Sequence, residues 1–149
     1  MRQGQTIDKE GKAVADEIQR VQYFYTEVPD KPGEGARVLG VLLKEEGINL
    51  LAFSGFPKGR RAQIDFIPAD QAAFKAAAKK AKIKVVGPKT GFVIQGDDRA
   101  GVIAEIVSKL SEAKINVTAL HAVAAGAGRY GAILWVKLRD VNKTAKILL

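Results

Sequence analysis

The sequence predicts an α+β fold made of two βαββαβ units in tandem, the second of which lacks its last strand. Two repeated motifs support this prediction. The turn "DKPG" at residues 30–33 returns as "DRAG" at residues 98–101, 68 positions later (30 to 98). The pattern "GIN" at residues 47–49 returns as "KIN" at residues 114–116, 67 positions later (48 to 115). The same motifs in the same order indicate an internal duplication, with one extra residue in the first copy near "GEG" at residues 33–35.

The first copy alternates strand and helix patterns. Aromatic and β-branched residues favour strands, and apolar residues at helical spacing follow "DKPG". The link "PKGR" between two strands is typical of a hairpin, and Asp70 is placed to cap an Ala-rich helix. The expected elements are strands at 21–28, 48–56, 61–67 and 83–87, a helix over 38–43 and a helix over 69–81.

The second copy repeats this order and then stops. We expect strands at 90–96, 115–123 and 130–138, a helix over 102–110, and a last helix over 140–149 that Asp140 caps. No counterpart of the strand at 83–87 follows. The expected domains are a leader at 1–20 with a short helix near 13–18, a first domain at 21–88, a "GPK" link at 87–89 and a second domain at 89–149.

Composition limits the class of protein. The 149 residues contain no cysteine, one histidine, and 24 Lys and Arg against 16 Asp and Glu, a formal net charge of +8. The leader lacks the apolar core of a signal peptide, and no apolar run is long enough to cross a bilayer. We therefore expect a cytoplasmic protein without a membrane partner. The basic residues are dispersed, as on a solubilising surface, although such a surplus also attracts nucleic acid.

A strand, then D-[KR]-x-G, an amphipathic helix, G-I-N and a hairpin resembles the ACT domain, a small-molecule-binding regulatory module. The resemblance spans nearly everything outside the leader. It implies ferredoxin-like units that pair side by side and bind an amino acid at the interface between two of them. It also implies a free amino acid or similar small molecule as ligand, a homodimer, and an enzyme as the regulated partner.

The candidate ligand-binding residues belong to the repeated motifs, together with the single histidine. They are Asp30, Lys31, Pro32, Gly33, Ile48, Asn49, Asp98, Arg99, Ala100, Gly101, Ile115, Asn116 and His121. A glycine at a helix entry lets a carboxylate approach free backbone N–H groups. Valine at either glycine should therefore abolish binding while the fold is kept.

Each polar candidate also has a structural interpretation. The two aspartates can accept a ligand's ammonium or cap their helices. The two asparagines can point an amide at an interface or adopt turn geometry. His121 aligns with Ser54 of the first copy and can bind a ligand or serve the fold.

Other function classes find less support. No phosphate loop, nucleophile elbow or metal-ligand set occurs, so we expect no enzyme, no cofactor and no metal. An RNA-binding fold of the same order needs stacking aromatics on one face, whereas Tyr130 and Trp135 should face opposite sides of their strand. A protein–protein interaction module that binds no ligand stays an alternative function. Both faces of the strand at 130–138 are apolar, which favours a homodimer.

Overall fold

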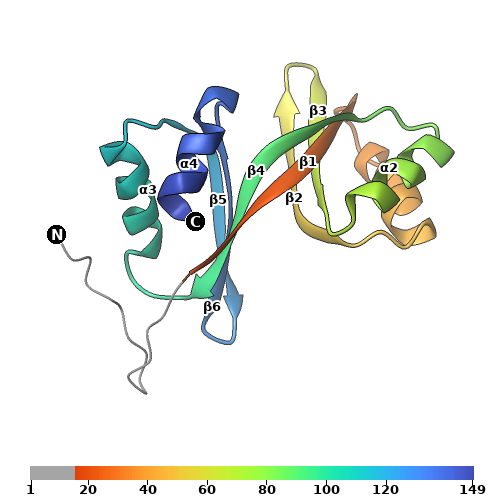
Figure 1. The fold of residues 1–149 in the computed structure, drawn as a ribbon. Helices are drawn as coiled ribbons and strands as arrows, with labels where there is room; N and C mark the ends of the chain where they lie inside the picture. The colour runs from red at the N-terminus through yellow and green to blue at the C-terminus, as the bar shows by residue number, and fades with distance from the viewer. Residues whose placement is uncertain (1–15) are drawn as a thin grey trace. The chain divides into compact units, whose positions relative to one another are not determined.

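The computed structural model describes residues 16–149 and shows the expected α+β fold of two units of βαββαβ type (Figure 1). Contacts divide the described chain into two compact units. The first unit comprises residues 21–90, and the second comprises residues 16–20 with residues 91–149. The predicted fold class is therefore confirmed.

The first unit packs its helices on an antiparallel sheet in the order β2-β3-β1. Phe66 of β3 lies opposite Phe24 of β1 and Phe53 of β2, which fixes the register of the three strands. The elements of this part of the chain are β1 (Glu17–Pro29), α1 (Glu34–Leu39), the π-helical turn η1 (Gly40–Glu45), β2 (Leu50–Lys58), β3 (Arg61–Pro68), α2 (Gln71–Lys80) and the start of β4 (Val86–Asp97).

The second unit repeats the arrangement with the strand order β4-β6-β5. Ile133 of β6 lies opposite Val93 of β4 and His121 of β5. Its further elements are α3 (Val102–Glu112), β5 (Val117–Gly126), β6 (Arg129–Val136), the 3₁₀ turn η2 (Leu138–Asp140) and α4 (Val141–Leu148).

The strand missing from the second copy comes from the start of β1. Strand β1 is the neighbour of β4, residues 17–20 belong to the second unit, and Ile18 packs against that unit's core. In the first unit the corresponding strand is the start of β4, where Thr90 accepts a hydrogen bond from Gln22 of β1 (3.4 Å). Both units therefore contain four strands.

Two local predictions are wrong because β1 begins earlier and β4 begins earlier than the sequence suggested. The "GPK" segment at residues 87–89 lies within β4 and is not a link, and residues 83–85 precede that strand. In the leader, Glu17 and Ile18 lie in β1 and not in a helix, while residues 13–15 of the expected helix lie outside the described residues. Glycine and proline suggested a break, but proline is tolerated in strands where its missing N–H is not needed.

The extra residue of the first copy lies in η1 and not near "GEG". The first helical turns of the two copies correspond at a spacing of 68, since Arg37 N–H bonds to Gly33 C=O and Glu105 N–H bonds to Gly101 C=O, both at 3.0 Å. The helix ends correspond at a spacing of 67, from Ile48 to Ile115. A π-helical turn takes in more residues than an α-helical turn, and η1 lies between these two points.

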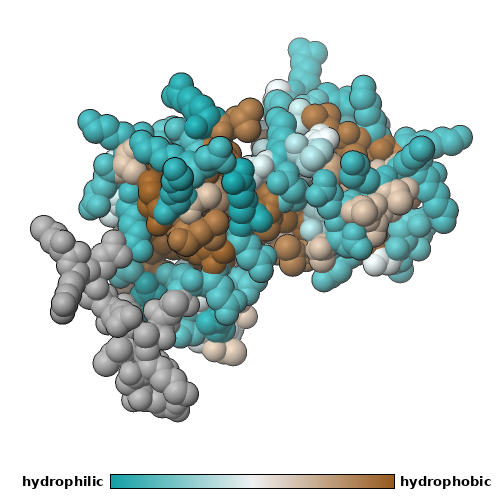
Figure 2. Space-filling model, in the orientation of Figure 1, coloured by the Kyte–Doolittle hydropathy of each residue, from teal (hydrophilic) through white to brown (hydrophobic). Residues whose placement is uncertain are grey.

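Each unit has its own apolar core between its helices and one face of its sheet. The first core centres on Phe24, Phe66, Phe74 and Leu42, and the second on Phe92, Ile94, Leu110 and Leu134. Figure 2 shows hydrophobic residues gathered between hydrophilic ones on the visible face of the molecule. Within residues 16–149, no helix is long and apolar enough to span a membrane.

The predicted cap of α2 is confirmed, because Asp70 Oδ1 accepts a hydrogen bond from Ala73 N–H (3.0 Å). The predicted cap of α4 is wrong, since the Asp140 side chain makes no capping bond. We expect Asp70→Ala to lower the free energy of unfolding by about 1 kcal/mol, and Asp140→Ala to lower it by less than about 0.5 kcal/mol. Urea denaturation measures both, and equal losses would contradict the assignment.

Candidate functional site

The two repeated turns have the same backbone geometry. Gly33 and Gly101 are the residues that precede α1 and α3, and both have left-handed φ values, +92° and +83°. Glu34 N–H bonds to Lys31 C=O and Val102 N–H bonds to Arg99 C=O, both at 3.4 Å. Glycine adopts such φ values without the steric penalty of a Cβ, so the duplicated motif encodes a duplicated turn.

The aspartates of the turns do not cap the helices. Neither α1 nor α3 has a side-chain capping bond at its N-terminus. Asp30 and Asp98 are both exposed, and the Asp98 backbone N–H bonds to Gly128 C=O (2.8 Å). The capping interpretation of Asp30 and Asp98 is therefore wrong. Both carboxylates face solvent.

An open groove of about 340 Å³ lies beside the first turn. Asp30 and Lys31 contribute charge to its rim, and Leu39 of α1 with Phe53 and Phe56 of β2 contributes an apolar surface. The groove thus combines one carboxylate, one ammonium and exposed aromatic rings. Such a combination fits a small molecule that carries both charges and an apolar part.

Gln63 links this groove to a buried carboxylate on β3. Gln63 lines the groove and donates a hydrogen bond from Nε2 to Asp65 Oδ1 (2.9 Å). Burial raises the pKa of Asp65, and the Gln63 hydrogen bond partly counteracts this increase. Gln63 is therefore held in place at the groove wall by Asp65, two residues along the same strand.

The same region of the second unit is filled by side chains. Val28 pairs with Ala62 in the first sheet as Gly96 pairs with Tyr130 in the second, and Lys31 of the first turn corresponds to Arg99 of the second. Where the small Ala62 lines the open groove, Tyr130 is buried in the second core. The two turns therefore share a backbone but differ in what lies beside them.

Asp16 completes the filled site of the second unit. The Tyr130 hydroxyl donates a hydrogen bond to Asp16 Oδ1 (2.9 Å), and Arg99 Nη1 lies 3.4 Å from the same oxygen. Arg99 Nη2 also donates to Glu105 Oε2 (2.6 Å). Gly96 lies beneath, where a Cβ would come within 2.8 Å of the Tyr130 ring and overlap Asp16 Oδ1.

This burial and pairing shift two pKa values. Burial, followed by the hydrogen bond to Asp16 and its negative charge, raises the pKa of Tyr130 well above the ordinary value for tyrosine. Burial lowers the pKa of Arg99, but its hydrogen bonds to Glu105 and Asp16 outweigh this and raise it overall. Arg99 is therefore a permanent cation and Tyr130 a permanent hydroxyl donor at neutral pH.

The remaining turn residues, Pro32 and Ala100, are exposed beside their glycines and make no wall of the groove. The "IN" residues lie at the far end of each sheet. Leu50, next to Asn49, pairs with Pro68, whereas Pro29, next to the first turn, pairs with Arg61. Strand β2 spans nine residues between these ends, about 30 Å of extended chain. Within one unit, the structure does not bring the two motifs together.

The isoleucines of the "IN" motifs serve the two cores. Ile115 is buried in the second core, and Ile48 packs against the first. Asn49 and Asn116 are exposed at the starts of β2 and β5, and Asn49 C=O accepts a hydrogen bond from Ala69 N–H (3.0 Å). The packing of Ile48 and Ile115 therefore explains why the "IN" motif occurs in both copies, and a ligand is not needed to explain it.

His121 lies on the exposed edge strand β5. Its ring meets Trp135 edge to face, with centroids 6.0 Å apart and planes at 82°. His121 pairs with Ile133, in the middle of the strand, whereas the second turn adjoins Arg129 at the end of β6. Among the described residues, no group of three or more His, Cys, Asp or Glu side chains could hold a metal ion.

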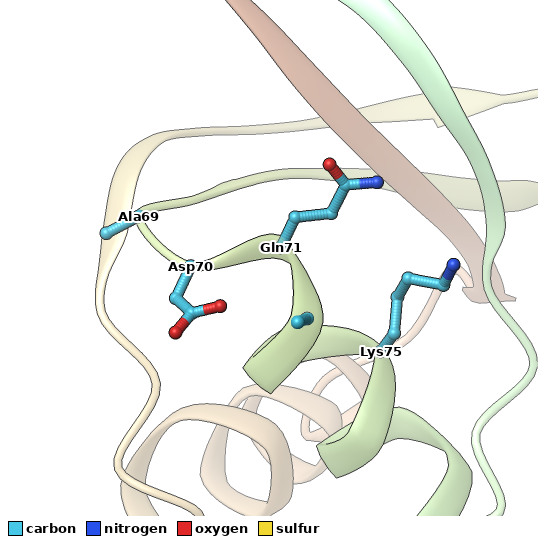
Figure 3. A pocket seen from close by; sticks show the side chains of 5 residues that line it. Ala69, Asp70, Gln71 and Lys75 are labelled. Atoms are coloured by element: carbon cyan, nitrogen blue, oxygen red, sulfur yellow. The ribbon is translucent and has the colours of Figure 1, made fainter.

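A further hollow of about 660 Å³ opens at the start of α2. It is built from one short segment, and its Asp70 carboxylate already caps the helix. Figure 3 shows Gln71 and Lys75 pointing away from Asp70. Because its polar groups do not converge, this hollow lacks the arrangement of a binding site.

Sequence reasoning missed Asp16, Tyr130 and the aromatic residues Phe53 and Phe56. The repeat gave no direct signal for Tyr130, because the spacing of 67 after the "IN" motifs sets Arg129 against Ala62. Only the strand pairing, Val28 with Ala62 and Gly96 with Tyr130, matches Tyr130 to Ala62. A large side chain opposite a small one marks the place where two copies differ in available space.

The sequence matches no model of a known protein family and no curated protein. Solved structures do resemble the fold. Protein BT0572 from Bacteroides thetaiotaomicron has a TM-score of 0.72 at 19% identity, over 91% of this chain and 86% of that one. The aspartokinase alpha and beta subunits give a TM-score of 0.60 at 17% identity, over 91% of this chain and 96% of that one.

The ligand-free regulatory subunit of aspartate kinase from Thermus thermophilus gives a TM-score of 0.57 at 18% identity, over 91% of this chain and 93% of that one. At such identities the likeness defines the fold alone. The chain therefore has an ACT-like fold of the ferredoxin type, the class of fold that these regulatory subunits also show.

Proposed function

We propose that this protein is a regulatory protein that senses a free amino acid or a similar small molecule in the cytoplasm, and that it is not an enzyme. The observation that carries the proposal is the open groove beside the first turn. It joins Asp30 and Lys31 to the exposed rings of Phe53 and Phe56. Lys31 would bind a ligand's carboxylate, Asp30 would bind its ammonium, and the rings would contact its side chain.

The fold supports the same assignment, since solved structures of similar fold include regulatory subunits of aspartate kinase. A regulator of this kind acts by binding its ligand more tightly in one state than in another. We propose a homodimer as the assembled form and an enzyme as its regulated partner. A dimer would give light scattering twice the mass of one chain at high micromolar concentration, and a monomer mass would contradict it.

A second candidate function is pairing with a second copy without any ligand. Strand β2 is an edge strand of the first unit, and Leu51, Phe53 and Phe56 on it are 44%, 44% and 39% exposed. Edge strands with exposed apolar residues favour pairing with another chain. Isothermal titration calorimetry with the twenty amino acids separates the two candidate functions. A protein that only pairs with a second copy binds none of them.

A thermal-shift screen of the twenty amino acids should identify a ligand, because a molecule that binds only the folded state raises its stability. For that amino acid, Lys31→Gln should weaken binding roughly 10- to 100-fold, the value of one charge-assisted hydrogen bond. Isothermal titration calorimetry measures the change.

The matched control for this variant is Lys79→Gln on α2. Lys79 is also an exposed lysine of the first unit, but it does not line the groove. The control should bind as tightly as the wild type. Equal affinities of all three proteins would remove the groove as the binding site.

A further inference from the structure

The contacts of Asp16 are those that a bound carboxylate would make. Its Oδ1 atom receives both the Tyr130 hydroxyl (2.9 Å) and the Arg99 guanidinium (3.4 Å). The Asp16 and Arg99 side chains are only 17% and 21% exposed. A carboxylate held by a guanidinium and a hydroxyl at such low exposure is a strong recognition pattern.

We propose that Arg99 and Tyr130 form a carboxylate-binding site at the second turn, which the chain's own Asp16 fills. A ligand's carboxylate binds there only after Asp16 has left. The identity of that ligand as an amino acid rests on the proposed function, but the existence of the site does not. In the wild type, the second site is therefore closed while the groove beside the first turn is open.

Arg99 retains donor capacity that Asp16 does not use. Its Nε atom is buried and has no hydrogen-bond partner among the described residues. A guanidinium can bind a carboxylate through two parallel N–H groups, whereas both contacts of Asp16 end on one oxygen. The Nε–H group lies on the Nη2 side of the guanidinium, toward Glu105. A free carboxylate that is not tethered to β1 can instead accept from Nη1 with one oxygen and from the Tyr130 hydroxyl with the other.

The site also keeps its shape without Asp16. Glu105 of α3 holds the other end of the guanidinium through Nη2 (2.6 Å). Tyr130 is fixed by the second core, and Gly96 has no side chain to occupy the space. Removing the Asp16 carboxylate therefore leaves both donors in place.

Chemical rescue with formate tests the site. Asp16→Ala should melt at a lower temperature than the wild type in sodium chloride. Sodium formate at the same ionic strength should raise its Tm, because formate replaces the missing carboxylate. Formate should shift the Tm of the wild type and of Asp16→Ala/Arg99→Gln several-fold less.

Asp16→Asn is the matched control, since its amide occupies the space without the charge and should show no rescue. Equal formate shifts in wild type and Asp16→Ala would overturn the proposal, as would the absence of any shift in Asp16→Ala. If Asp16→Ala folds only in formate, that result supports the site.

If Asp16→Ala folds in neither salt, a double-mutant cycle between Asp16→Asn and Tyr130→Phe decides. If the losses of stability from the two substitutions are coupled, the result supports Arg99 and Tyr130 as a carboxylate site. If the losses simply add, the proposal is overturned.

A titration separates this inference from the proposed function. With the amino acid found by the thermal screen, the wild type should bind one molecule per chain and Asp16→Ala two. If the wild type binds no amino acid, the proposed function fails while formate rescue still tests the site. If the wild type binds one and Asp16→Ala shows no formate rescue, the further inference fails alone.

Discussion

Replacing Phe74 by alanine is expected to lower the free energy of unfolding by about 3–5 kcal/mol, the usual loss for a fully buried phenylalanine. Phe74 of α2 is 0% exposed. Its ring lies 5.2 Å from the ring of Phe24 and 5.2 Å from that of Phe66. These three side chains join α2 to β1 and β3, so the cavity would open in the centre of the first core. Urea denaturation measures the loss.

The matched control is Phe53→Ala on β2. Phe53 contacts the same cluster, with its ring 5.9 Å from that of Phe66, but it is 44% exposed. We expect a loss of about 1 kcal/mol for Phe53→Ala, because less apolar surface returns to water. Since Phe53 lines the groove and Phe74 does not, Phe53→Ala should weaken ligand binding more. Equal losses of stability would show that the packing is misassigned.

Local patterns predicted the elements whose partners are close in sequence. Alternation along residues 130–138 placed Tyr130 and Trp135 on opposite faces of the strand, and the structure confirms this. Asp70 was recognised as a cap because its partner lies only three residues away. Such contacts depend on backbone periodicity and on hydrogen bonds within one turn, both of which a sequence displays directly.

Contacts between distant residues could not be predicted in the same way. Asp16 and Tyr130 are 114 positions apart, and nothing near Asp16 in the sequence indicates that partner. The expectation that the second copy ends without a strand was correct for its own sequence. The strand that fills the place comes from residues 17–20, which were assigned to a leader. A strand's neighbours depend on the whole topology and not on its own residues.

In the candidate site, too, local features could be predicted and contacts between distant residues could not. The turns were predicted because glycine at a helix entry is a local signal, and both glycines have positive φ. The groove beside the first turn needs Phe53 and Phe56 from β2, which only the folded sheet brings there. Ile115 was a candidate for ligand binding because it repeats Ile48, but its burial shows that the repeat maintains a core.

The two copies share a fold but differ in what lies beside the repeated turn. In the first unit, Lys31 and Ala62 leave an open groove. In the second unit, Arg99 and Tyr130 hold Asp16 in the equivalent place. Under our proposal the protein has two ligand sites of unequal affinity, because a ligand must displace Asp16 only at the second turn. The unequal sites would extend the range of ligand concentration to which a regulator responds.

Valine in place of Gly33 or Gly101 should lower the free energy of unfolding by about 2–3 kcal/mol, because a β-branched residue is strained at positive φ. The sequence alone suggested that such variants would keep the fold and lose only the ligand. The structure changes this expectation. No heavy atom lies within 4 Å of a Cβ built at either glycine, so the loss arises from the backbone and not from a collision.

Asparagine at the same two positions is the matched control. Asparagine tolerates the left-handed region better than other residues with a Cβ, so Gly33→Asn and Gly101→Asn should be clearly more stable to urea than the valine variants. If asparagine and valine destabilise equally, the positive φ values are not what the turns require. Calorimetry on Gly33→Asn then tests the ligand directly in a folded protein. Binding that survives asparagine but not valine shows that Gly33 acts through the turn's conformation, whereas loss in both shows that its bare backbone is the surface that the ligand approaches.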